Sequence, residues 1–456
     1  RRFASVWSEY KGFGFISNGL NLVFGRIKKE KIIYHIKEKN MKGLKGALVF
    51  AQSGGPTSVI NASAAGVFIE GLKSKQITAV YGAAHGIRGI LEEEFYDMSK
   101  EDKKELLLLK NTPSSALGSV RYKLKDASVD DTDYKRLLEV FKKYDVRYFF
   151  YNGGNDSMDT CNKISKYMAK SGYEMNVIGV PKTIDNDLFG TDHCPGFASA
   201  AKYIATSVME INLDAKVYDT PMVCVIECMG RNAGWLTAAA SLANYKGLGA
   251  DLIYLPETVF DVDKFVADVK DVCAKNNNKC IAVVSEGIRD KDGNLICEVL
   301  GTAGLKDSFG HAQLGGVAAQ LASLIKEKTG YKTRGIELSL MQRCGAHCAS
   351  KTDIEETFNA GREAVKAAVN GETDKMVCYA RKAGDKYVCE YKLLPLELAA
   401  NTERTVPQEW IINNGTGISE EFVKYALPLI QGECDMKKED GLPRFAHLKK
   451  VLVEKR

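Results

Sequence analysis

Two carboxylates two residues apart are the clearest sign of chemistry in this chain. Asp185 and Asp187 follow an apolar run and share the stretch 181–187 (PKTIDND) with Lys182 and Thr183. In an extended segment, residues i and i+2 point to the same side, so we expect both carboxylates to face one ligand. One can hold Mg²⁺ while the other accepts a proton from an attacking hydroxyl. A polar turn with helix caps is the plainer alternative, but it does not require this combination of residues.

A first diglycine turn offers backbone that could bind phosphate. Gly54 and Gly55 lie in residues 53–58 (SGGPTS), directly after an apolar run, and we expect Ser58 to begin a helix. Glycine lets backbone N–H groups approach a ligand closely, and a helix N-terminus attracts phosphate. A tight strand-to-helix turn is the alternative.

A second diglycine turn carries a carboxylate. Gly154 is followed by Asn155 and Asp156, again between an apolar run and a helical pattern. As a helix cap, Asp156 would contribute about 1 kcal/mol, which is the structural alternative to a role in binding. Two such turns in one chain favour phosphate binding.

Several arginines supply positive charge that could bind phosphate. Arg231 lies in residues 229–234 (MGRNAG), between an apolar run and a helical pattern. Its planar fork binds phosphate oxygens bidentately, although a surface ion pair is the plainer interpretation. Three further charged residues end or border other apolar runs: Glu286, Arg334 and Arg343. Phosphate loops, paired carboxylates and arginines together indicate Mg²⁺-dependent phosphoryl transfer.

The elements that must position these residues alternate along the chain. We expect strands at 47–50, 147–151, 177–180, 223–227 and 281–285, a strand-like run at 336–341, and helices at 58–72, 157–169, 198–211, 234–243 and 262–274. This alternation predicts an α/β fold in which helices cover both faces of parallel sheets. Ligands bind at the carboxyl ends of such strands, where these loops lie.

Length and composition restrict the remaining possibilities. The chain has 456 residues, 45% of them hydrophobic and 27% charged, with a net charge of +5. That suits two soluble domains and excludes a largely disordered chain. No apolar stretch approaches the ~20 residues that span a membrane. Residues 1–45 alone carry a net charge of +8. The positive charge therefore lies outside the folded domains, and we expect no nucleic-acid partner.

The N-terminal residues and the cysteines carry smaller expectations. We expect the native protein to begin at Met41 and residues 1–40 to be appended sequence, with a short basic surface extension as the alternative. The twelve cysteines are scattered without a C-x-x-C pair. A disulfide scaffold would be short and dense in cysteine, and this chain is neither. The run from Cys344 to Cys348 has no common zinc spacing. We expect reduced, buried thiols in a cytoplasmic enzyme.

In their order, these motifs resemble the phosphofructokinase family over residues 46 to about 400. ATP-dependent members usually carry glycine where this chain has Asp156 and Lys182, and the resemblance is to the pyrophosphate-dependent branch. A carboxylate at 156 would lie where the α-phosphate of ATP binds, at a cost of roughly 4 kcal/mol for like charges ~4 Å apart. Pyrophosphate lacks that phosphate, and Lys182 would supply it with positive charge.

The resemblance implies a function, a fold and partners. The function is reversible, Mg²⁺-dependent phosphoryl transfer from pyrophosphate to the 1-hydroxyl of fructose 6-phosphate, by a homodimer or homotetramer. The fold is two Rossmann-like domains with the active site in the cleft between them. Residues 46–191 and about 345–395 would form the donor domain and residues 192–344 the sugar-phosphate domain. Residues 1–45 would be an N-terminal extension and 396–456 a C-terminal one without an assigned role.

The resemblance also implies the role of each site residue. Asp185 would be the base, and Lys182 and Asp156 would act with it in catalysis. Pyrophosphate would be bound by Gly54, Gly55, Arg121, Gly154 and Asn155. Fructose 6-phosphate would contact Thr183, Ile184, Asp185, Met229, Gly230, Arg231, Glu286 and Arg343, with Arg334 reaching it from a neighbouring subunit. Asn155 and Asp187 would hold Mg²⁺.

Three positions depart from the family pattern. Asn155 replaces the usual Asp near the metal, Leu340 replaces His or Tyr, and Met222 replaces an Arg that bridges subunits in allosteric members. The loss of that Arg gives no support to allosteric control. An ATP-dependent enzyme of the same family is one alternative function. A non-catalytic regulatory subunit is another, and Asn155 is the only residue that favours it.

Overall fold

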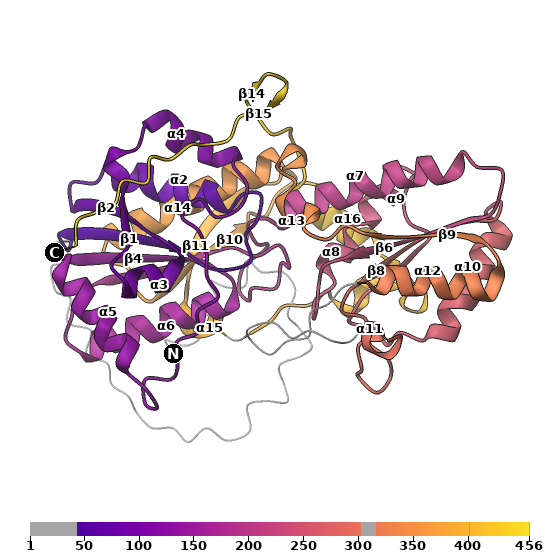
Figure 1. Cartoon of the computed structure of the whole chain (residues 1–456), viewed down its shortest axis with the longest axis horizontal. Coiled ribbons are helices and arrows are strands. Elements are labelled where there is room, and N and C mark those ends of the chain that lie inside the picture. The colour runs from indigo at the N-terminus through magenta and orange to yellow at the C-terminus, as the bar shows by residue number, and fades with distance from the viewer. Residues whose placement is uncertain (1–42, 302–315, 401, 456) are drawn as a thin grey trace.

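The computed structural model describes residues 43–301, 316–400 and 402–455. The described chain forms two large β-sheets side by side, each with helices on both faces (Figure 1), and two small two-stranded sheets, β12-β13 (Ile411–Ile412 and Gly417–Ile418) and β14-β15 (Lys438–Glu439 and Leu442–Pro443). The predicted α/β class is confirmed. The expectation that the native protein begins at Met41 concerns residues outside the described ranges.

The first sheet has seven strands in the order β11-β10-β5-β4-β1-β2-β3. Their bounds are β1 Gly46–Gln52, β2 Ile77–Ala83, β3 Phe95–Asp97, β4 Val146–Gly153, β5 Asn176–Pro181, β10 Lys375–Arg381 and β11 Cys389–Pro395. The five central strands are parallel, and β3 and β11 pair antiparallel at the edges. One face packs on α2 (Ile60–Gly71) and α14 (Lys351–Val369), the other on α5 (Thr132–Lys143) and α6 (Asn155–Lys170).

The second sheet has four parallel strands in the order β7-β8-β6-β9. They are β6 Met222–Cys228, β7 Leu252–Tyr254, β8 Lys279–Ser285 and β9 Lys332–Glu337. One face packs on α7 (Phe197–Lys216) and α8 (Trp235–Ala238), the other on α10 (Val262–Lys275) and α12 (Val317–Thr329). The strands of both sheets are largely apolar and buried, as parallel sheets covered on two faces require.

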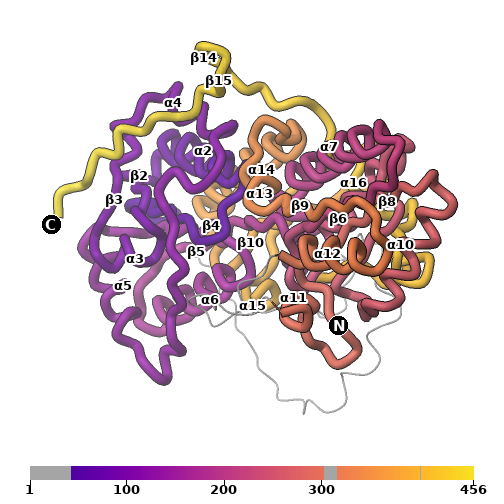
Figure 2. The backbone as a smooth tube through the Cα atoms, turned by 45° about the vertical axis from the view of Figure 1, so that its right-hand side comes forward, coloured from indigo at the N-terminus to yellow at the C-terminus, as the bar shows by residue number. Residues whose placement is uncertain are grey.

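The C-terminal segment contacts both sheets. After β11, residues 406–429 pack on the core beneath the second sheet, where α16 (Glu420–Ala426) buries Phe422. The chain then returns to the first sheet, where Leu452 forms a bridge with Tyr96 of β3 (Figure 2). The last fifty residues therefore connect the two halves of the molecule.

Most of the predicted elements are confirmed, and three details are wrong. The five predicted strands each lie within an observed strand, and the helices at 157–169, 198–211 and 262–274 lie within α6, α7 and α10. Helix α2 begins at Ile60 instead of Ser58, because the Val59 N–H first donates to Thr57 Oγ1. The predicted helix at 234–243 is two short helices, α8 and α9 (Ser241–Asn244).

The strand-like run at 336–341 is also shifted. The strand is β9, residues 332–337, so Arg334 lies within it, and Arg343 lies in the short helix α13 (Met341–Cys344). The chain leaves the strand because Ser339 has a positive φ of 42°, which extended backbone does not allow.

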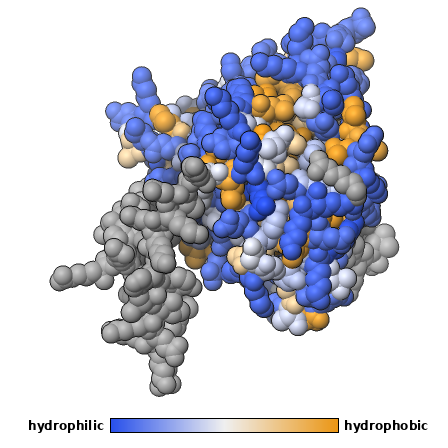
Figure 3. All heavy atoms as spheres, turned by 90° about the vertical axis from the view of Figure 1, so that its left-hand side faces the viewer, coloured by the Kyte–Doolittle hydropathy of each residue, from blue (hydrophilic) through white to orange (hydrophobic). Residues whose placement is uncertain are grey.

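The cysteines are free thiols, and most of them are buried as expected. All twelve cysteines are free; eight are buried, while Cys344 and Cys348 are only half-buried, contrary to the expectation that they pack inside. Among the described residues, the helices are too short or too polar to cross a membrane. Hydrophilic residues predominate on the face shown in Figure 3, with hydrophobic ones in small groups between them.

Candidate active site

The turn after β5 carries the two aspartates. The Lys182 N–H donates to Gly153 O at 2.9 Å, which extends the pairing with β4 by one residue. The Asp185 N–H then donates to Thr183 Oγ1 at 3.1 Å, and Asn186 takes a left-handed φ of 56°. The extended stretch predicted here is therefore a turn. The short side chain of Asn tolerates this conformation better than most residues.

The charges of the turn lie close enough to perturb one another. Lys182 is 4% exposed, and its Nζ donates to Gly54 O at 2.7 Å. Burial lowers the pKa of Lys182 to about 8, although the charges of Asp185 and Asp187 oppose that shift. Burial and the charge of Glu286 raise the pKa of Asp185, against the attraction of Lys182 and Arg343. The predicted base therefore shares one electrostatic environment with residues from both sheets.

The first glycine turn lies against Lys182 and Arg121. A Cβ added at Gly54 would lie 2.8 Å from Arg121 Cγ, and one added at Gly55 would lie 3.4 Å from Lys182 Nζ. Gly55 also has a φ of 68°, which glycine adopts without strain. The structure thus brings together three of the predicted donor-binding residues and the predicted catalytic lysine.

The second glycine turn leads directly into α6. A Cβ on Gly153 would clash with Ser157 Oγ, which donates to Ser53 Oγ of the first turn at 2.7 Å. Helix α6 begins at Asn155 with Gly154 as its N-cap, and Asp156 is an exposed residue of the first turn. Asp156 therefore does not cap the helix, so the structural alternative for this carboxylate is wrong.

An oxygen at the start of α6 and one in the aspartate turn suit a hard cation. Asn155 Nδ2 donates to Asp187 Oδ2 at 3.1 Å. The other oxygens of the pair, Asn155 Oδ1 and Asp187 Oδ1, are buried without a hydrogen-bond partner among the described residues. Buried oxygens are rarely left unpaired, and Mg²⁺ prefers oxygen ligands. The pair predicted to hold the metal therefore fits Mg²⁺.

The loop between β6 and α8, residues 229–234, is predicted to bind the sugar phosphate and is called the sugar loop below; it is held through its backbone. The Gly230 N–H donates to Glu286 Oε1 and the Met229 N–H to Gln342 Oε1, both at 3.1 Å. Ser285 Oγ donates to Gly230 O at 2.5 Å. Met229 packs on the same apolar cluster as Ile184 of the aspartate turn. The aspartate turn and the sugar loop therefore border the same core, and Arg231 follows Gly230 directly.

Arg334 is the predicted residue that lies apart from the others. Its Cα pairs with Cys224 on β6, five residues before Met229, which corresponds to roughly 16 Å along the strand. It is exposed and borders a hollow of about 340 Å³ lined also by Glu210, Asp214, Tyr218 and Met222. Within one chain, Arg334 does not join the remaining site residues.

The sequence did not point to several residues that support the site. Glu403, from the C-terminal segment, accepts from Asn232 Nδ2 at 3.3 Å, and its charge contributes to the raised pKa of Asp185. Glu257 Oε1 accepts from the Gly234 N–H at 2.8 Å. Gln342 had one available signal, its position beside Arg343, whereas the other two lie outside any recognisable motif.

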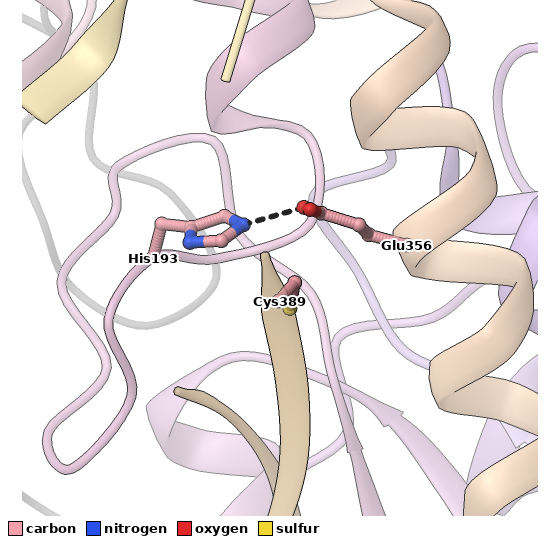
Figure 4. Close-up of side chains that lie close together, drawn as sticks. All are labelled: His193, Glu356 and Cys389. Atoms are coloured by element: carbon pink, nitrogen blue, oxygen red, sulfur yellow. Dashed lines mark hydrogen bonds and ion pairs between the residues drawn. The ribbon is translucent and has the colours of Figure 1, made fainter. Parts of the chain in front are cut away.

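A histidine cluster anchors the chain that follows the aspartate turn. His193 Nδ1 lies 2.9 Å from Asp192 Oδ1 and its Nε2 lies 2.8 Å from Glu356 Oε2 on α14 (Figure 4). Burial alone would lower the pKa of His193, but Glu356 and Asp192 raise it to about 9. Cys389 lies close to His193 and Glu356, and these three side chains resemble a metal site. Both ring nitrogens already face carboxylates, so an imidazolium accounts for the cluster without a metal.

Two parallel-rich sheets whose loops carry glycine turns, a buried lysine and paired carboxylates define a phosphotransferase of the α/β class. The sequence profile of the phosphofructokinase family matches residues 47–368. The chain belongs to the phosphofructokinase family.

Named relatives place the chain within that family. It is 44% identical, over 89% of this chain and 97% of the relative, to a pyrophosphate–fructose 6-phosphate 1-phosphotransferase of Halomonas elongata. It is 46% identical, over 90% of this chain and 98% of the relative, to the enzyme of that name from Xanthomonas campestris pv. campestris. The crystal structure of a pyrophosphate-dependent phosphofructokinase from Marinobacter aquaeolei is similar, with a TM-score of 0.81 and 40% identity. That match covers 91% of this chain and 98% of the other.

Proposed function

We propose that this chain transfers a phosphoryl group reversibly from pyrophosphate to the 1-hydroxyl of fructose 6-phosphate. The observation that carries the proposal is the buried Lys182 Nζ, 2.7 Å from Gly54 O, between the first glycine turn and the aspartates. A cation fixed there suits a compact, highly charged donor. Asp156 at the start of α6 acts against ATP by repelling its α-phosphate. The names of the full-length relatives support the same substrates.

In this proposal, the donor lies between the two glycine turns. Backbone N–H groups at Gly54, Gly55 and Gly154, together with Lys182 and Arg121, hold the pyrophosphate oxygens. Asp156 excludes larger donors. Catalysis of phosphoryl transfer consists mainly of such positioning and charge neutralisation.

Asp185 acts as the general base. As the sugar O1 attacks the nearer phosphorus, a new O–P bond forms, the bridging P–O bond breaks and phosphate leaves. Asp185 takes the proton of the 1-hydroxyl and returns it in the reverse reaction. Its raised pKa brings the carboxyl closer to working pH, which favours proton transfer in both directions.

Asn155 and Asp187 would hold Mg²⁺ through their unpaired oxygens. When bound, the ion neutralises charge on the donor oxygens. The neutral amide of Asn155 contributes less to binding than a second carboxylate would.

The sugar phosphate lies against the second sheet. Met229, Gly230, Arg231, Glu286 and Arg343, with Thr183 and Ile184 of the aspartate turn, would contact fructose 6-phosphate. Arg334 would complete the site from a neighbouring subunit, since it lies apart within one chain, and this requires a homodimer or homotetramer. We assign residues 46–191 and 345–395 to the donor domain, 192–344 to the sugar-phosphate domain, and the enzyme to the cytoplasm.

Donor choice gives the direct test. Fructose 1,6-bisphosphate formation is measured with fructose 6-phosphate, Mg²⁺ and either pyrophosphate or ATP as the sole donor. We expect activity with pyrophosphate, and we expect Asp156→Gly to admit ATP while weakening pyrophosphate use. Asp159→Asn, one turn further along α6, is the matched control and should leave donor choice unchanged. Transfer from ATP by the unaltered protein, or from neither donor, would contradict the proposal.

A further inference from the structure

One arginine of the C-terminal segment holds the aspartate turn through backbone carbonyls. Arg404 Nη2 donates to Asn186 O at 2.8 Å, and Nη1 donates to Thr191 O at 3.1 Å and Asp192 O at 2.5 Å. The Arg404 N–H also donates to Asp187 O at 2.8 Å. A single side chain therefore contacts both ends of the loop that carries the second aspartate.

The same arginine contacts the sugar loop on its other side. Its guanidinium carbon lies 4.5 Å from the centroid of the Trp235 ring, and Trp235 Nε1 donates to Arg404 O at 2.9 Å. Trp235 is the first residue of α8, directly after the sugar loop. Two residues beyond the arginine, the Val406 N–H donates to Glu257 Oε1, which also accepts from Gly234 at the end of the sugar loop. Residues 404–406 thus connect the aspartate turn to the sugar loop.

A tyrosine from α16 fixes the residue between the aspartates. Asn186 is 0% exposed, and its Nδ2 donates to Tyr425 Oη at 2.9 Å while its Oδ1 accepts from the Cys194 N–H at 2.8 Å. Tyr425 Oη in turn donates to Asp192 O at 2.8 Å. Asn186 is the residue with positive φ, so these contacts hold the backbone where it reverses.

From these contacts we infer that Arg404 and Tyr425 are positioning residues for Asp185 and Asp187, and that Arg404 couples their turn to the sugar loop. The inference rests on the proposed function, in which Asp185 is the base. A base must lie within hydrogen-bond reach of the hydroxyl, and a displacement of 1 Å can cost about 100-fold in rate. The planar fork of arginine donates in several fixed directions at once, which lysine cannot reproduce.

The chain offers a matched control in Arg381. Its Nη2 donates to Tyr425 O at 2.9 Å and lies 3.2 Å from Asp192 Oδ1, and its guanidinium carbon lies 5.2 Å from the Tyr425 ring centroid. It shares these neighbours with Arg404, but its hydrogen bonds go to neither Asn186 nor Thr191. Replacing it should disturb the same packing without releasing the turn.

The test compares Arg404→Lys, Tyr425→Phe and Arg381→Lys in the full chain. We expect kcat with pyrophosphate to fall about 100-fold for Arg404→Lys, and less for Tyr425→Phe, which removes only the hydroxyl. The KM for fructose 6-phosphate should stay within about 3-fold of wild type in both, well below the effect on kcat. Amide hydrogen exchange over residues 183–192 should accelerate in both variants and not in Arg381→Lys. If Arg404→Lys does not fold, Tyr425→Phe decides.

The outcomes separate this inference from the proposed function. If the unaltered protein transfers phosphate from neither pyrophosphate nor ATP, the proposed function fails, and hydrogen exchange alone judges whether Arg404 holds the turn. If the unaltered protein is active and Arg404→Lys keeps its kcat, the inference is overturned. Equal losses of kcat in Arg404→Lys and Arg381→Lys would also overturn it, because they would indicate a general effect on packing.

Discussion

The loops after β4 and β5 place charged side chains against one another, whereas the segments after β6, β8 and β9 use side chains to hold backbone. On the first sheet, Lys182, Asp185 and Asp187 shift one another's pKa values, and Asn155 contacts Asp187 directly. On the second sheet, Glu286 and Gln342 accept from the backbone N–H groups of the sugar loop. The first arrangement sets the protonation of the side chains, and the second fixes the backbone conformation of the sugar loop.

This difference predicts a division of labour between the two sheets. Changes to coupled charges alter the protonation of every partner, so they should affect the chemical step and the donor. Changes around a backbone-held loop should alter how well the sugar phosphate fits, with little effect on chemistry. The following substitutions test this division in order of expected effect.

The largest effect should come from Asp185→Asn. The amide keeps the size of the side chain but cannot accept the hydroxyl proton, so kcat should fall about 1,000-fold. The KM for fructose 6-phosphate should change little, because the second sheet would hold the sugar. Steady-state kinetics with saturating pyrophosphate measures both values. A change in the KM for fructose 6-phosphate with kcat preserved would show instead that Asp185 acts in sugar binding, as the loops of the second sheet do.

A smaller effect should come from Lys182→Met. Loss of a hydrogen bond to a charged group, about 2 kcal/mol, should raise the KM for pyrophosphate about 30-fold. The pKa of Lys182 is lowered to about 8, so the ammonium loses its proton as pH rises through that value. The KM of the unaltered protein for pyrophosphate should therefore rise above pH 8, and that rise should be absent from the variant. A KM independent of pH between 7 and 9 in both proteins would contradict the assignment.

Arg343→Lys should weaken the binding of fructose 6-phosphate and leave the binding of pyrophosphate unchanged. Lysine keeps the charge but loses bidentate binding of the 6-phosphate, so the KM for fructose 6-phosphate should rise about 10-fold, an effect of about 1.4 kcal/mol. The KM for pyrophosphate and kcat should stay close to their original values. Since the charge of Arg343 also acts on Asp185, Arg343→Met should in addition lower kcat. If Arg343→Lys and Arg343→Met lowered kcat equally, the proposed division of labour between the two sheets would be contradicted.

The smallest effect on activity should come from His193→Gln, whose consequence is for stability. The folded pKa of His193 is about 9, above its usual value of 6.5, so its contribution is fully present below pH 6.5 and lost as pH rises through about 9. The difference in unfolding free energy between the two proteins should thus be largest near pH 6, at about 2–3 kcal/mol, and shrink by pH 10. Urea unfolding at several pH values measures it. A constant difference would indicate a neutral histidine.

The sequence predicts those parts of the site that follow directly from a single strand. Lys182, Asp185 and Asp187 stand together in seven residues, and each glycine turn follows an apolar run, so their place at strand ends could be expected. The turn itself could not, because the positive φ of Asn186 depends on Tyr425 and Cys194, which lie elsewhere in the chain. The roles of Gln342, Glu257 and Arg404 likewise depend on contacts with backbone groups, which no pattern of residue types reveals.

The position of Arg404 in the chain has a consequence for biosynthesis. It stands 218 residues after Asn186, whose carbonyl it binds. At about 5–20 residues per second, a ribosome needs roughly 10–40 s to add those residues. For the last 36 of those residues, roughly 2–7 s, the nascent chain contains every residue of the family match, 47–368, but not the arginine that holds the aspartates. A growing chain should therefore contain the strands of both large sheets before it contains the arginine that holds its aspartates in place.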